Sequence, residues 1–411
     1  MRAPQYSTAP DEILSSEAIA DPQHLYSRLR QQTPLARIDE SGFHTVANWS
    51  LIEEVLGREQ DFSANLTGVL YRGADGQPDC FALPSSSATN VIATADEPAH
   101  GVHRSILQPR FLAAHIKVME PLLRQWAATV LQPLINTGSG DFIPAAEQLP
   151  ARAVAYLLGL PQADLQQHRT WAMMGGDILA GEISGEGLTS LANETAAMAL
   201  YLGQHLDNAL ANPDPSENAP ILHTLARAVG TGDIDREQAL GMAIVLFGAG
   251  GESTAALIGS VLYRLAQNPA LAQQMRRSPE LVPRFVEEVI RLEPPFKFHY
   301  RAVQQNCKLG GYDLVPGDRL MLLWASANRD PQRFSAPNEL HLDRKQGRQH
   351  LGFGRGMHFC IGAGLARLEA KVMLEALLAD GRQLQCIAEQ PAVYARSIFV
   401  RRLEQLPMQL T

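Results

Sequence analysis

The sequence predicts a mainly α-helical fold with a smaller β region. From Pro98 to about Leu292, apolar residues recur at three- and four-residue spacing, the period of amphipathic helices. Strand-like alternation is confined to shorter segments, and no run of alternating strands and helices indicates a Rossmann-type sheet. The 411 residues contain no tandem repeat and no long low-complexity linker. We therefore expect a single domain over residues 1–411.

Composition narrows the class of protein. Hydrophobic residues make up 45% of the chain and charged residues 19%, as in soluble globular proteins. The net charge of −8 argues against a nucleic-acid binder. Residues 1–22 lack an apolar run, so neither a signal peptide nor a membrane anchor is expected. Four scattered cysteines (Cys80, Cys307, Cys360 and Cys386) form no CxxC pair, which disfavours a zinc site or disulfide scaffold and favours the cytoplasm.

The elements outside the helical region follow from local patterns. Residues 35–46 alternate around a Glu-Ser-Gly turn and predict a hairpin. Residues 68–90 are rich in Gly, Pro and Ser and predict a long functional loop. Gly-Gly and Pro-Gly turns divide a second strand region at 307–326. A last helix is expected over 361–380, with Gly381 at its C-cap.

The stretch "FGRGMHFCIG", residues 353–362, carries the strongest chemical signal. Cys360 stands just before a predicted helix, where free N–H groups and the helix dipole lower the pKa of a thiol. Gly354, Gly356 and Gly362 would let the backbone bend close to the sulfur. A thiolate held there is a nucleophile or a metal ligand. The alternative is an ordinary buried cysteine.

This stretch resembles the haem-binding loop of the cytochrome P-450 family, Phe-Gly-x-Gly-x-x-x-Cys-x-Gly. The resemblance implies that family's fold, with a long central helix over haem b. It also implies Cys360 as the iron ligand, Phe353 as the ring packed beside it, Gly362 as a neighbour of the haem, and His358 as a propionate partner.

A second motif is "EVIR", with Glu288 and Arg291 at i and i+3 on one helix face. Its apolar neighbours suggest a half-buried pair, and the alternative is a surface salt bridge of little energetic worth. The motif resembles the family's ExxR motif, and Arg344 resembles the third member of its network. The implied role is structural: these residues hold the cysteine loop.

A long helix is expected over residues 236–268. Gly248, Gly250 and Gly251 interrupt its apolar centre, and each costs a helix about 1 kcal/mol relative to alanine. Such a cost implies a gain elsewhere, such as the close approach of a flat ligand. The alternatives are a core helix, or a membrane span that Glu252 would interrupt.

The segment "AGGEST" within this helix resembles the family's oxygen-activation segment. The resemblance implies Ala249 and Gly250 beside the haem, and Glu252 as a proton relay. It implies Ser253 as the alcohol near bound oxygen, where the family usually has threonine. Serine lacks the methyl group that restrains χ1, so the expectation is either a looser proton delivery or a Thr254 that shares the task.

Cationic side chains predict the partners of the haem propionates. His100 and Arg104 lie at i and i+4 on a predicted helix and suit an anion, although a solvated helix face is the alternative. The pair resembles the family's propionate motif, and Arg301 matches a further propionate arginine.

Family analogy predicts an apolar substrate pocket, suited to a lipophilic small molecule of natural-product or secondary-metabolite type. Core packing is the alternative for its phenylalanines, and Lys297 would bind a carboxylate if it faced inward. The expected lining residues are Asn90, Ile92, Val245, Gly248, Phe296, Phe298 and Phe399.

The activity implied by the resemblance is that of a cytoplasmic haem-thiolate monooxygenase, which inserts one oxygen atom from O2 into its substrate. Electrons would come from a separate ferredoxin and reductase, docking near Arg110 and Arg355 on a monomer without a membrane anchor. The alternatives are oxidative coupling, dehydration or peroxide-driven oxidation on the same haem, and a non-enzymatic haem sensor.

Overall fold

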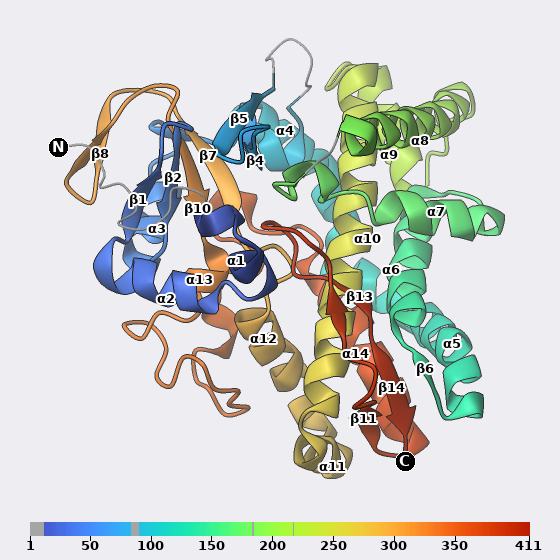
Figure 1. Cartoon of the computed structure of the whole chain (residues 1–411). Helices are drawn as coiled ribbons and strands as arrows, with labels where there is room; N and C mark the ends of the chain where they lie inside the picture. Colours follow the sequence, from blue (N-terminus) through green and yellow to red (C-terminus); the bar gives the residue numbers. More distant parts are fainter. Residues whose placement is uncertain (1–11, 84–89, 183–184, 217) are drawn as a thin grey trace.

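A computed structural model describes residues 12–83, 90–182, 185–216 and 218–411. A β-rich part on the left of Figure 1 joins elements from the start of the chain to the strands β7 and β10. A helical part on the right surrounds the long helix α10. The predicted class, mainly α with a smaller β region, is confirmed. The helices are α1 (Ser16–Ala20), α2 (Gln23–Gln32), α3 (Trp49–Leu56), α4 (Ala99–Leu107), α5 (Ala113–Thr137), α6 (Ile143–Leu158), α7 (Leu165–Ala172), α8 (Gly185–Ala211), α9 (Ile221–Thr231), α10 (Arg236–Ala266), α11 (Pro269–Arg277), α12 (Val282–Leu292), α13 (Trp324–Ala327) and α14 (Ala363–Asp380).

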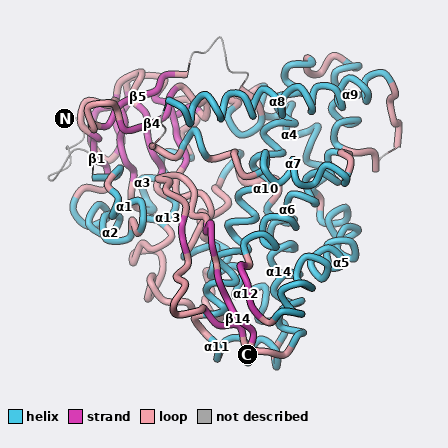
Figure 2. The backbone as a smooth tube through the Cα atoms, turned by 45° about the vertical axis from the view of Figure 1, so that its right-hand side comes forward, coloured by secondary structure: helices cyan, strands magenta, loops and turns pink. Residues whose placement is uncertain are grey.

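Strands form one mixed sheet of five and several smaller sheets, which Figure 2 separates from the helices by colour. The five-stranded sheet has the order β1-β2-β10-β7-β3, in which β10 runs parallel to β2 and the other neighbours are antiparallel. The strands are β1 (Leu35–Ile38), β2 (Phe43–Val46), β3 (Phe62–Ser63), β4 (Gly68–Arg72), β5 (Pro78–Ala82), β6 (Ser139–Asp141), β7 (His299–Val303), β8 (Cys307–Leu309), β9 (Tyr312–Leu314), β10 (Arg319–Leu322), β11 (Leu384–Cys386), β12 (Val393–Tyr394), β13 (Leu403–Gln405) and β14 (Pro407–Leu410).

The long helix α10 begins at a capping box. The Asp235 carboxylate accepts from the backbone N–H of Gln238 at 2.7 Å, and the Gln238 side chain accepts from the Asp235 N–H at 2.9 Å. The helix ends at Ala266, two residues before the predicted end. By length and apolarity α10 would suffice to cross a membrane, but most of that apolar stretch is buried inside the molecule.

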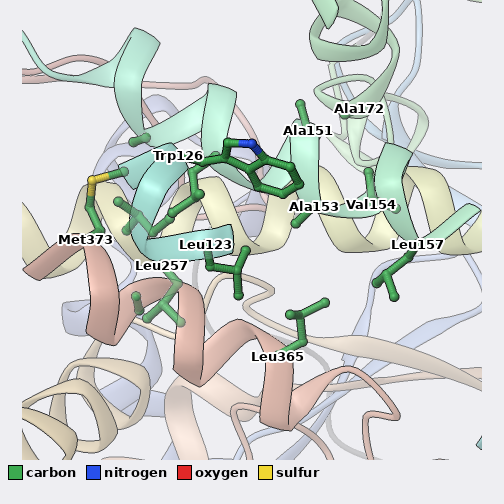
Figure 3. Packing of buried hydrophobic residues seen from close by; sticks show 14 of the residues in the cluster. Leu123, Trp126, Ala151, Ala153, Val154, Leu157, Ala172, Leu257, Leu365 and Met373 are labelled. Carbon is green, nitrogen blue, oxygen red and sulfur yellow. The ribbon is translucent and has the colours of Figure 1, made fainter. Parts of the chain in front are cut away.

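The largest hydrophobic cluster lies where α5, α6, α10 and α14 meet (Figure 3). Each of these helices turns an apolar stripe toward the others, as the three- and four-residue spacing predicts. The cluster fixes α10 and α14 relative to each other. Helix α10 carries the "AGGEST" segment, and helix α14 begins directly after the cysteine loop. The residues labelled in Figure 3 are Leu123, Trp126, Ala151, Ala153, Val154, Leu157, Ala172, Leu257, Leu365 and Met373.

The predicted hairpin at 35–46 is confirmed, since β1 and β2 pair antiparallel. The predicted loop over 68–90 is wrong for its first part. There β4 and β5 form a second hairpin from Gly68 opposite Ala82 to Arg72 opposite Pro78, and residues 84–89 lie outside the described part. The Gly and Asp residues that indicated a loop instead form the hairpin turn, where Gly76 takes a φ of 84°.

The strand region at 307–326 contains β8, β9 and β10, but its last residues belong to the short helix α13. The last helix, α14, ends as predicted: Gly381 has a φ of 87° and its N–H donates to the Leu378 carbonyl.

The glycines of α10 serve helix packing more than a flat ligand. A Cβ on Gly251 would lie 2.4 Å from the Cβ of Ala172 on α7, so only glycine allows the two helices this close. Gly248 faces Gly175, and a Cβ there would meet its Cα at 3.5 Å, an ordinary contact. Of the three, only Gly250 lines the cavity described below.

We therefore expect Gly251→Ala to lower the free energy of unfolding by about 1–3 kcal/mol, because the added methyl group overpacks the α7–α10 contact. Gly230→Ala on α9 is the matched control: its Cβ would meet no atom within 4 Å, so helix propensity should raise stability by up to about 1 kcal/mol. Urea unfolding measures both. Equal shifts in the two variants would contradict the packing argument.

Candidate functional site

A cavity of about 240 Å³ lies between α10, α4, β7 and the loop that ends at Cys360. Apolar side chains make up much of its wall, and cationic or imidazole side chains gather on one part of it. The predicted residues that line it are Ile92, His100, Arg104, Val245, Ala249, Gly250, Ser253, Thr254, Phe296, Arg301, Phe353, His358, Cys360 and Gly362.

Four residues predicted to contact substrate do not line this cavity: Asn90, Gly248, Phe298 and Phe399. Phe298 and Phe399 are buried in the hydrophobic core, with their ring centroids 5.4 Å apart. Gly248 packs against Gly175. The sequence does not reveal which side of each segment faces the cavity, which is why these four residues were expected there.

Lys297 points away from the cavity as well. Its ammonium group is buried and donates to the carbonyl of Ser397 at 2.6 Å, with the carbonyl of Ile19 at 3.5 Å. The expectation that it binds a substrate carboxylate in this cavity is therefore wrong.

The cysteine loop is shaped by its own backbone. The Cys360 N–H donates to the Phe353 carbonyl at 2.9 Å, which closes the loop on itself. Gly354 and Gly356 take φ angles of 67° and 76°, as the glycine pattern predicts. The sulfur does not require a glycine at position 362, because a Cβ there would lie 3.9 Å from the Cys360 Sγ, an ordinary contact distance.

The Cys360 thiol does lie at the start of α14, but its pKa is not lowered overall. Burial raises the pKa, and the backbone N–H groups of Gly362 and Ala363 and the guanidinium groups of Arg367 and Arg104 only partly oppose this. A thiolate at this position therefore needs a further positive charge, such as a metal ion, for full stabilisation.

A buried carboxylate that the motifs did not single out holds residues on both sides of the loop. Glu287 on α12 accepts from Arg367 Nε at 2.5 Å, and its other oxygen lies 2.9 Å from His350 Nε2. Burial alone would raise the pKa of Glu287, but these partners lower it to about 2. The Arg367 guanidinium lies over the Phe353 ring, 4.4 Å from its centroid. Gly352 fits against α12 because a Cβ would lie 2.4 Å from an Ile290 methyl group.

The Glu288–Arg291 pair is fully buried rather than half-buried. Both Glu288 oxygens accept from Arg291, at 2.8 and 2.9 Å, and from Arg344 Nε, at 3.0 and 3.1 Å. The two arginines also donate to backbone carbonyls between residues 328 and 339. This network therefore fixes the segment before the cysteine loop, while Glu287 fixes the residues that flank the loop, His350 and Arg367.

The cavity has one cationic wall. Arg104 donates to the Phe359 carbonyl at 2.9 Å, and the rings of His100 and His358 lie 4.2 Å apart. Burial lowers the pKa of His358 to about 3 and that of Arg301 to about 10. The Nδ1 atom of His358 is buried and has no hydrogen-bond partner among the described residues. This wall is suited to an anionic group that would supply the missing acceptor.

His299 belongs to the same wall, although no motif pointed to it. Its Nδ1 accepts from the Trp324 indole N–H at 2.6 Å, which leaves Nε2 to carry the proton when the ring is neutral. Burial lowers the pKa of His299 to about 3, so the ring is neutral at pH 7. The period of two in strand β7 puts residues 299 and 301 on one face, a signal that the sequence did contain.

Glu369 on α14 was also missed. Its carboxyl group is buried at the cavity wall, one oxygen has no partner within the described residues, and burial raises its pKa well above the ordinary value.

The acid and the alcohol of α10 point to different sides of the helix. Ser253 and Thr254 line the cavity, and the Ser253 hydroxyl donates to the Ala249 carbonyl at 2.6 Å. Glu252 is buried on another face, where Arg402 Nε donates to it at 3.2 Å. Burial raises the pKa of Glu252 to about 7, against the opposing effect of Arg402.

These residues fit haem b. The sulfur of Cys360 at a helix start would bind the iron, and the apolar chamber beside it would hold the porphyrin. The cationic wall, with the unsatisfied imidazole nitrogen of His358, would bind the propionates.

Comparisons with known proteins agree with this chemistry. The family model for cytochrome P-450 matches residues 214–380. Cytochrome P-450 144 of Mycobacterium tuberculosis is 40% identical over 398 residues, which span 96% of this chain and 90% of that protein. A mutant of P-450 EryK in complex with erythromycin B superposes with a TM-score of 0.81 at 27% identity, covering 95% and 97% of the two chains. Cytochrome P-450 CREJ in complex with (4-ethylphenyl) dihydrogen phosphate shares the fold, with a TM-score of 0.86 at 23% identity over 96% and 98%.

The extent of these matches, added to the cysteine loop and its cavity, shows that the chain belongs to the cytochrome P-450 family and is a monooxygenase that binds haem b.

Proposed function

We propose that this chain oxygenates a lipophilic small molecule at the cavity between α10 and the cysteine loop, with Cys360 as the iron ligand. The observation that carries the proposal is that Cys360, Ser253 and Thr254 line one apolar cavity. Haem bound there supplies the dioxygen chemistry. The protein's own residues hold the haem, exclude water, deliver protons and orient the substrate.

His100, Arg104, Arg301 and His358 are the proposed partners of the haem propionates. Two carboxylates would neutralise the two guanidinium groups and give the His358 Nδ1 atom a partner when that nitrogen carries the proton. His299 would donate through Nε2, because Trp324 occupies its other nitrogen. Phe353 would pack beside the Cys360 sulfur under the Arg367 guanidinium.

The substrate is proposed to be apolar. Ile92, Val245, Leu246 and Phe296 form a wall without a charged group near the alcohols of α10. A mutant of the structural relative EryK was solved in complex with erythromycin B, which supports a small organic molecule of secondary-metabolite type as substrate. The Phe296 ring is held by stacking on Phe399, 4.6 Å between centroids, so it forms a fixed wall.

Proton delivery is proposed to run from Glu252 toward the cavity. Its carboxyl group changes charge near pH 7, so it can both take up and release a proton under working conditions. The backbone turn between Glu252 and Ser253 separates it from the cavity. Relay to Ser253 or Thr254 therefore needs a rotation of the Glu252 side chain away from Arg402, or an intervening water.

The electron donor is proposed to be a ferredoxin that docks on the face carrying the cysteine loop. The side chain of Arg355 is 48% exposed there, and Phe359 is 40% exposed beside it. Arg355 is paired with Glu53 at 3.2 Å, so an acidic partner would compete with that carboxylate for the guanidinium group. Arg110 is a weaker contact than expected, because it already donates to the Asn218 carbonyl.

The first test is the carbon monoxide difference spectrum of the reduced, haem-loaded protein, followed by turnover with a surrogate ferredoxin and reductase. We expect the strongly red-shifted Soret band in the native protein and its loss in Cys360→Ser, because the serine oxygen cannot replace the thiolate. Peroxide-driven product without an electron donor would favour a peroxygenase instead. Ligand binding without any product would favour a haem sensor.

A second prediction concerns Glu287. Replacing it with glutamine removes the charge that holds Arg367 and His350, so the cysteine loop loosens. We expect a larger fraction of the reduced protein to lack the red-shifted band and that fraction to grow faster on warming. Glu375→Gln on α14, which breaks a partly exposed pair with Arg124 on α5, is the control and should leave the band unchanged. Equal bands in both variants would exclude the positioning role.

A third prediction is the pH dependence of Glu252. Arg402 lowers the pKa of this carboxyl group and Asp177 raises it. We therefore expect the pKa to rise above about 7 in Arg402→Gln and to fall in Asp177→Asn, so that the ionised fraction at pH 7 changes in opposite directions. The infrared absorption of the protonated carboxyl group measures this directly. The pH profile of product formed per electron should move the same way, and profiles that coincide would remove Glu252 from the proton path.

A further inference from the structure

A second cavity lies on the other side of the segment that carries Lys297. Its volume is about 280 Å³, far above the roughly 10–15 Å³ that a single water needs. It is lined by α2 along its length, by the ends of α10 and α12, and by residues from the later part of the chain. It shares no lining residue with the haem cavity, so it is a separate site.

The wall of this cavity carries an excess of positive charge. Only two carboxylates, Asp21 and Glu293, line it among the described residues. The cationic side chains outnumber them. The five cationic residues of the wall are Arg30, Arg264, Lys297, Arg329 and Arg401.

Glu293 is already shared among three of the arginines. It is paired with Arg264, accepts from Arg401 Nε at 3.0 Å, and lies 3.7 Å from Arg329. Lys297 bonds only to carbonyl oxygens within the described chain, those of Ser397 and Ile19. One buried carboxylate is therefore paired with three cations. The negative side chains of the cavity wall do not balance its positive ones.

Burial lowers the pKa of two cations of this wall, Lys297 and Arg329. Burial and the nearby Arg401 lower the pKa of Lys297 to about 7. Burial also lowers the pKa of Arg329 to about 10, with Arg264 and Arg291 adding to the shift. The side chain of Arg329 is only 9% exposed, and its Nε–H has no acceptor among the described residues. An unsatisfied buried guanidinium donor is costly unless a ligand or ordered water completes it.

We propose that this cavity is a binding site for a multiply charged oxyanion, namely a phosphate group, either free or carried by a small molecule. Arginine forks match the oxygens of a phosphate in pairs, and several donors of one wall would converge on it. Access comes from the side of Asp21 and Asn338, both of which are exposed. The proposal does not depend on the activity at the haem.

Calorimetric titration of the haem-loaded protein with inorganic phosphate and pyrophosphate, at low and constant ionic strength, tests the site. We expect saturable binding of one anion per chain. Thermal unfolding should shift upward by about 3 °C at a hundredfold excess over Kd, since only the folded chain offers the site.

Two variants in the cavity should change affinity in opposite directions. Arg264→Gln removes a cation from a partly exposed position, leaves Glu293 paired with Arg401, and should weaken binding about tenfold. Asp21→Asn removes a repelling carboxylate from the rim and should tighten binding about twofold. Arg236→Gln is the matched control, because it removes one arginine charge from a surface pair with Asp207 and should leave affinity unchanged.

Phenyl phosphate distinguishes the two sources of the ligand. Tighter binding than that of inorganic phosphate would indicate a phosphate ester as the natural ligand, and weaker binding would indicate free phosphate. The absence of saturable heat and of any thermal shift with all three probes would overturn the proposal. Equal weakening in Arg264→Gln and Arg236→Gln would also overturn it, because it would show non-specific attraction to the chain's surface.

Discussion

The burial of two adjacent carboxylates on α12, Glu287 and Glu288, is the constraint on which the rest of the site depends. A buried carboxylate must be matched by cations, and consecutive residues on a helix point in different directions, so each recruits its own partners. Glu288 binds Arg291 and Arg344, which hold the segment from Asn328 to Glu339 by its carbonyls. Glu287 binds His350 and Arg367, which hold the cysteine loop. One turn of helix thus positions the whole face that carries the sulfur.

The opposite wall of the haem cavity depends on one helix with two distinct faces. Toward the cavity, α10 offers Ala249, Gly250 and the alcohols of Ser253 and Thr254. Toward α7, Gly251 allows the contact with Ala172. Glu252 is directed into a buried polar cluster, and there Arg402 from the C-terminal segment controls its charge. Glu252 and Ser253 are therefore neighbours along the chain, but their side chains lie on different sides of α10. A movement of the Glu252 side chain can control the delivery of a proton to the cavity.

The segment between α12 and β7 separates two cavities of opposite character. Phe296 and His299 face the apolar haem cavity, whereas Lys297 faces the cationic one. Phe298, between Lys297 and His299, packs in the hydrophobic core instead, so the segment does not follow a simple alternation of two faces. Backbone hydrogen bonds to Phe399 and Ala325 keep the segment rigid, with Lys297 N–H donating at 2.8 Å and Ala325 N–H donating to the Lys297 carbonyl at 3.1 Å.

The sequence by itself determined what depends on near neighbours: the hairpin at 35–46, the capping box and extent of α10, the glycine-shaped cysteine loop and the Glu288–Arg291 pair. The residues that form each of these features lie close together in the sequence. Only the tertiary structure decided which side each segment presents. Phe298 and Phe399 entered the core, Lys297 turned to the second cavity, and Glu252 met Arg402 from 150 residues away. Glu287 likewise gained its role from His350 and Arg367, because the partners of a buried charge are chosen by packing between elements far apart in the chain.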